Sequence, residues 1–113
     1  MGSISFEFTS IGRFKTAQDA YIAECEEAQY EYGHDYYNGT ISTTDGCSRE
    51  SNSPRFGTRK FDGFIGNKLE KMDKGDCRYV EIEGAALKKL KERNGYKGKR
   101  NIKAFFFYGW ARC

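Results

Sequence analysis

The strongest structural signal in this chain is the aromatic stretch KAFFFYGW, residues 103–110. Successive side chains of a β-strand point to opposite faces of its sheet. The two sets are Phe105, Phe107 and Gly109 on one face, and Phe106, Tyr108 and Trp110 on the other. Both sets contain large aromatic rings, so the stretch predicts a central strand with helices over one face. The other face must be covered as well, or it becomes an exposed aromatic binding surface.

Four elements elsewhere in the chain have clear local patterns. Phe6 and Phe8 alternate with polar residues, as in a half-buried strand, and a second alternation surrounds Val80. Small and apolar residues recur at helical spacing between Thr16, which suits an N-cap, and Gly33, which suits a helix end. The predicted elements are strands over 4–9 and 78–83 and helices over 17–32 and 85–93.

The middle of the chain has weaker patterns. Clustered Gly, Asn, Ser and Asp residues predict turns, and threonines favour an extended chain. We expect a turn over 34–39, β-structure over 40–44, a long mobile loop over 46–60, a strand and a turn within 56–65, and a short helix from Asn67 to Gly75.

Together these elements predict an α+β fold. The expected architecture is a mainly antiparallel sheet of about four strands, with two or three helices packed on one face. The 113 residues suffice for one core, so residues 1–113 are predicted to form a single domain.

Composition excludes several classes of protein. Aromatic residues make up 16% of the chain, which argues against a disordered protein. No apolar run approaches the roughly 20 residues of a membrane span, and no signal-peptide core follows Met1. These observations favour the cytoplasm, where the four cysteines would be reduced thiols. We expect Cys25 in the core and Cys113 in solvent.

The net charge of +3 conceals a strong asymmetry. Residues 1–53 contain three basic and nine acidic side chains, a net charge of −6. Residues 84–113 contain nine basic and one acidic side chain, a net charge of +8. The two parts are expected either to attract one another within the fold, the favoured interpretation, or to form separate charged surfaces.

Catalytic chemistry has little support in the sequence. His34 and Asp35 are the only start of an acid–base pair, and adjacent residues rarely adopt the required geometry. Cys25 lies among glutamates, which disfavour a thiolate. The cysteine spacing does not fit a zinc site. We therefore expect no catalytic residue, no metal, no cofactor and no enzymatic activity.

The acidic stripe on the predicted first helix is the favoured partner-binding surface. Glu24, Glu27 and Glu31 lie three and four residues apart, and Tyr36 and Tyr37 follow in the next turn. Such a stripe is suited to a basic partner surface and mimics phosphate. The alternative is an ordinary solvent-facing side of a helix.

The basic C-terminal part provides a second hypothesis. Its lysines and arginine could neutralise phosphates while Tyr96 stacks on a base. The residues of this nucleic-acid site would be Lys88, Lys89, Lys97, Lys99, Arg100 and Tyr96. A nucleotide-binding sponge is a further alternative.

Three segments together resemble small phage and mobile-element proteins. They are AQDAY at 17–21, GHDYYNGTI at 33–41 and FYGWA at 107–111. The resemblance implies a non-enzymatic binder in the host cytoplasm, such as an inhibitor of host defence of the anti-CRISPR kind. Its partner would be a host protein or nucleoprotein complex, which it would occlude stoichiometrically.

Overall fold

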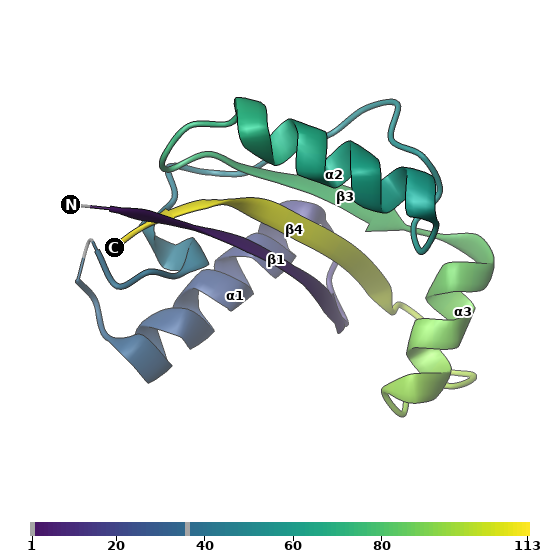
Figure 1. The fold of residues 1–113 in the computed structure, drawn as a ribbon. Helices are drawn as coiled ribbons and strands as arrows, with labels where there is room; N and C mark the ends of the chain where they lie inside the picture. Colours follow the sequence, from purple (N-terminus) through teal and green to yellow (C-terminus); the bar gives the residue numbers. More distant parts are fainter. Residues whose placement is uncertain (1, 36) are drawn as a thin grey trace.

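The computed structural model describes residues 2–35 and 37–113. Its elements in chain order are β1 (Ser3–Gly12), α1 (Ala17–Tyr32), a 3₁₀ turn (Ile41–Thr43), β2 (Ser48–Arg49), α2 (Arg59–Lys71), β3 (Cys77–Ile82), α3 (Gly84–Arg93) and β4 (Lys103–Arg112). The strands form one sheet in the order β1-β4-β3-β2 (Figure 1). The β1–β4 and β3–β4 pairs are antiparallel, and β2 joins β3 in parallel. The predicted α+β class is confirmed.

The aromatic stretch forms the centre of the sheet, as predicted. β4 lies between β1 and β3, so Phe107 is opposite both Phe8 and Tyr79. The Phe107 and Tyr108 side chains are completely buried, on opposite faces. A strand with two hydrophobic faces has to be covered on both, and this requirement places the helices.

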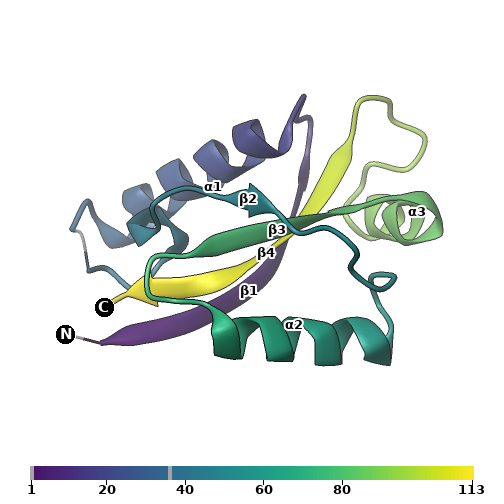
Figure 2. The same ribbon diagram turned by 90° about the horizontal axis from the view of Figure 1, so that it is seen from above.

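The helices cover both faces of the sheet rather than one, which corrects the predicted packing. On one face, Phe105 and Phe107 pack against Ala20 and Tyr21 of α1. On the other face, Tyr108 and Val80 of the sheet pack against Phe61 and Ile65 of α2. Figures 1 and 2 show α1 and α2 on opposite sides of the strands, with α3 projecting at one end. Helices therefore cover parts of both faces of β4: Phe105, Phe107 and Tyr108 are buried, and Phe106 and Trp110 are half-buried.

The α2 helix corrects two of the predicted elements. A strand and a turn were expected within 56–65 and a helix only from Asn67, whereas α2 runs from Arg59 to Lys71. The Thr58 hydroxyl accepts a hydrogen bond from the Phe61 N–H at 3.2 Å and begins the helix. Gly63 and Gly66 lie on the exposed side, where glycine costs only about 1 kcal/mol of helix propensity. Burial of Phe61 and Ile65 outweighs that cost.

Two further segments differ from the prediction. The threonine-rich residues form a 3₁₀ turn because their hydroxyls bond to nearby backbone groups: Thr43 Oγ1 donates to Thr40 O at 2.8 Å, and Thr44 Oγ1 to Ile41 O at 2.7 Å. The expected long loop over 46–60 is interrupted by β2 and ends in the first turn of α2.

Candidate functional site

An acidic groove lies between α1 and β1. It has a volume of about 290 Å³ and is lined by Phe6, Phe8, Glu24, Glu27, Ala28, Glu31, Tyr32, Thr40 and Ile41. The spacing of the three glutamates places them on one side of α1, as the sequence predicted. Period-two alternation directs the Phe6 and Phe8 rings to the face of the sheet that α1 covers. The groove thus combines an aromatic floor with a carboxylate rim.

The carboxylate of Glu24 is held in position by the sheet. The Ser10 hydroxyl donates a hydrogen bond to Glu24 Oε1 at 2.8 Å. Partial burial raises the pKa of the Glu24 carboxyl above its ordinary value, the Ser10 bond partly offsets this increase, and the neighbouring Glu27 adds to it. A cation in the groove would relieve this unfavourable ionisation.

The structure retains part of the predicted partner site and extends it. Glu24, Glu27 and Glu31 are brought together, whereas Tyr37 is exposed and does not line the groove. Tyr36 lies outside the described residues. Phe6 and Phe8 were not predicted as site residues, although their alternation with polar residues already placed them on one face of a strand.

The predicted nucleic-acid residues lie on a basic arm, which we define as residues 84–101. It consists of α3 and the turns that return the chain to β4 (Figure 1). The return is closed by hydrogen bonds from the Tyr96 N–H to Lys91 O at 2.8 Å and from Lys91 Nζ to Lys99 O at 2.7 Å. Lys88, Lys89, Lys97, Lys99 and Arg100 are exposed, and Tyr96 is half-buried.

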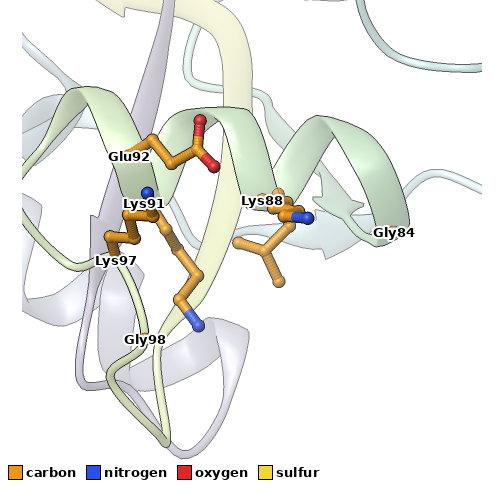
Figure 3. Close-up of a pocket in the computed structure, with 7 residues that line it drawn as sticks. Gly84, Lys88, Lys91, Glu92, Lys97 and Gly98 are labelled. Atoms are coloured by element: carbon orange, nitrogen blue, oxygen red, sulfur yellow. The ribbon is translucent and has the colours of Figure 1, made fainter.

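The lysines of the arm divide between two sides of α3. One hollow of about 490 Å³ is lined by Gly84, Leu87, Lys88, Lys91, Glu92, Lys97 and Gly98 (Figure 3). Lys89 lines a different hollow of about 430 Å³, together with Arg93, Arg55 and Phe56. The predicted set therefore does not form one compact site.

One ion pair joins the acidic part of the chain, residues 1–53, to the basic part, residues 84–113, in line with the favoured expectation: Asp45 with Arg112, at 2.8 Å. The ion pairs within residues 2–35 and 37–113 join Lys68 to Glu50, Arg78 to Glu50 and Arg112 to Asp45. None of them joins α1 to the basic arm.

Glu50 is a buried carboxylate within the segment predicted to be a long loop. Its Oε1 accepts hydrogen bonds from Tyr108 Oη at 2.6 Å and from Arg78 Nη1 at 3.3 Å. Burial and the negative Glu50 raise the pKa of the Tyr108 hydroxyl. Glu50 thus links the segment after β2 to Arg78 of β3 and Tyr108 of β4. A buried acid that is bonded in this way has a structural role.

All four cysteines are free thiols. Cys25 is half-buried and packs against the α1-side core, and Cys113 is exposed, as predicted. Cys77 is buried with its Sγ 3.1 Å from Cys47 Sγ. Burial raises the pKa of the Cys25 thiol, which disfavours it as a nucleophile.

The groups considered for catalysis are dispersed. His34 is exposed, and Asp35 Oδ1 accepts a hydrogen bond from the Tyr37 N–H at 3.0 Å, a turn interaction. Within the described part of the chain, no three His, Cys, Asp or Glu side chains are arranged to hold a metal ion. None of the helices described here combines the length and apolar character of a bilayer span.

Comparison of the chain with protein-family models, with curated protein sequences and with solved structures gave no match.

Proposed function

We propose that this chain is a non-enzymatic binding protein that uses the acidic groove to occlude a basic surface of a partner protein. The observation that carries the proposal is the meeting of Glu24, Glu27 and Glu31 with the half-buried Phe6 and Phe8 rings in one groove. An ordinary solvent-facing side of a helix lacks such an aromatic floor.

The chemistry of the groove favours lysine and arginine side chains. Their aliphatic stems pack on apolar surface, and their charged ends interact with aromatic faces and carboxylates. Phe6 and Phe8 offer the first kind of contact, and the glutamates offer the second. Binding energy would therefore come from an anchored basic side chain, and the rim carboxylates would select and orient it.

The resemblance to small phage proteins supports a biological setting for this activity. The partner would be a host-defence protein or nucleoprotein complex in the host cytoplasm, inhibited by stoichiometric occlusion. Basic nucleic-acid channels of such complexes carry the side chains that the groove favours.

The proposal is tested with a panel of fluorescent basic peptides. Replacement of the three groove glutamates by glutamine should weaken binding by about threefold to a hundredfold, since exposed ion pairs contribute about 0.2 to 1 kcal/mol each. The matched control replaces three other glutamates by glutamine. They are exposed and do not line the groove: Glu26, Glu70 and Glu83. The control should bind like the wild type. Equal affinities of the two triple variants would overturn the proposal.

Nucleic-acid binding by the basic arm is a second candidate function. Its support is the concentration of exposed Lys88, Lys89, Lys97, Lys99 and Arg100 on one projecting segment. Fluorescence anisotropy with single- and double-stranded nucleic acid should then show an affinity that falls steeply with salt. The Lys97/Lys99/Arg100→Glu variant should abolish this binding, and unchanged affinity would remove the candidate. A nucleobase absorbance in the purified protein would instead indicate the nucleotide sponge.

A further inference from the structure

The outer edge of β1 is open. β1 is the first strand in the sheet order, and within the described residues its only strand partner is β4. It is ten residues long, whereas β2 at the opposite edge has two. Natural sheets usually blunt such an edge with lysine, proline or a bulge. β1 contains neither residue, and its register with β4 is continuous from Ser3 to Gly12.

The hydrogen bonds at the chain ends show which groups point outward. The Gly2 N–H donates to Cys113 O at 3.0 Å, and the Cys113 N–H donates to Gly2 O at 3.2 Å. Hydrogen-bonded pairs alternate along an antiparallel ladder, so the even-numbered residues of β1 bond to β4. The N–H and C=O groups of Ser5, Glu7 and Thr9 are therefore directed to the free edge.

The free edge runs beside the acidic groove. Phe6 and Phe8 belong to β1 and also line the groove, and Ser10 of the same strand holds Glu24. A strand added to β1 would lie about 4.8 Å from it, with alternate side chains on the face that α1 covers. Long basic side chains on that face would reach back over the two rings toward the glutamates.

We propose that the partner contributes an extended, lysine- or arginine-bearing segment that adds to β1 as a fifth strand. This inference rests on the proposed function and specifies how the basic partner binds. Backbone hydrogen bonds to Ser5, Glu7 and Thr9 would supply affinity, and the groove would select basic side chains at alternate positions. Charge complementarity favours this occupant over a second copy, because symmetric pairing of two β1 edges brings two acidic grooves together.

The test uses a synthetic peptide of alternating lysine and threonine, with a glutamate–threonine peptide as the charge control. Amide hydrogen exchange of the isotope-labelled protein is measured by NMR with and without peptide. The lysine peptide should slow exchange at Ser5, Glu7 and Thr9 by about tenfold or more, because new hydrogen bonds protect these amides. Phe6 and Phe8, already bonded to β4, should change less. The glutamate peptide should protect none of them.

A proline substitution separates strand addition from charge attraction. Ser5→Pro removes an outward N–H, which an edge strand tolerates, and Ser5→Ala keeps it. Ser5→Pro should weaken binding of the lysine peptide by about tenfold, and Ser5→Ala should not. Unchanged exchange at Phe105 and Phe107 shows that each variant is folded.

The outcomes distinguish the two proposals. If the three glutamates are needed for binding but Ser5→Pro has no effect, strand addition is overturned and the acidic groove stands. If Ser5→Pro abolishes binding and the glutamate variant does not, the edge pairs without charge selection, which overturns both the basic partner and the proposed function. Absence of binding by the lysine peptide overturns both.

Discussion

The acidic groove and the basic arm have opposite charges, and the fold holds them in different ways. α1 buries Ala20 and Tyr21 in the core against Phe107, and one carboxylate of the groove, that of Glu24, is hydrogen-bonded to Ser10 of the sheet. None of the residues of α3 is buried, and the arm projects from the end of the sheet (Figures 1 and 2). A preorganised groove loses little entropy on binding and selects by shape. An exposed cationic segment attracts polyanions over a longer range and with less selectivity.

The largest expected effect tests how firmly each region is attached to the core. Phe107→Ala should lower the free energy of unfolding by about 3 to 5 kcal/mol, because it removes a fully buried ring between β1, β3 and α1. Leu87→Ala in α3 should cost about 1 kcal/mol or less, because Leu87 is only half-buried. Denaturant unfolding of both variants gives the comparison. Equal costs would show that the arm is as integral to the fold as the core that Phe107 of β4 forms with α1.

A pH effect of intermediate size is expected in the groove. The folded-state pKa of Glu24 is raised, so its contribution to stability is fully present below the ordinary glutamate value and is lost as the pH rises through the folded-state pKa. Glu24→Gln should therefore be stabilised relative to the wild type at neutral pH, and this difference should disappear in acid. Thermal unfolding across the acidic pH range measures it.

Two neighbours of Glu24 test the physical cause of that shift. Ser10→Ala removes a bond that lowers the pKa and should move the loss of stability to higher pH. Glu27→Gln removes a repulsion that raises the pKa and should move it to lower pH. If both substitutions moved the loss of stability in the same pH direction, the assigned causes of the raised Glu24 pKa would be wrong.

The smallest expected effect is a difference in labelling rate among the cysteine thiols of the wild-type protein. It involves no change in stability. Cys113 is exposed and should react first with a maleimide, whereas Cys77 is 4% exposed, has a raised pKa and should react last. Cys25 is half-buried on the core-facing side of α1 and should be slow as well. Mass spectrometry of partly labelled protein gives the order. Rapid reaction of Cys25 would show that α1 opens readily, which would weaken the contrast with the arm.

The elements predicted from local pattern and those missed differ in a physical way. β1, α1, β3, α3 and β4 repeat their own periodicity within a few residues, so neighbouring side chains were enough to identify them. α2 was missed because Gly63 and Gly66 resemble turn residues, and its stability comes from burial of Phe61 and Ile65 against a strand far along the chain. Thr40 and Thr43 favour a strand by intrinsic propensity. The Thr43 hydroxyl, however, donates a hydrogen bond to the nearby Thr40 carbonyl, and this local bond stabilises the 3₁₀ turn instead.

The candidate site shows the same division. Local sequence was sufficient to place Glu24, Glu27 and Glu31 on one side of a helix and the lysines of α3 in one segment, because helical spacing is a property of neighbours. Only the tertiary structure decided that the glutamates meet Phe6 and Phe8, that β1 is an edge strand, and that the two charged regions stay apart. These relations depend on which strands pair across about one hundred residues of chain, and pairing at that range is selected by burial of both faces of β4.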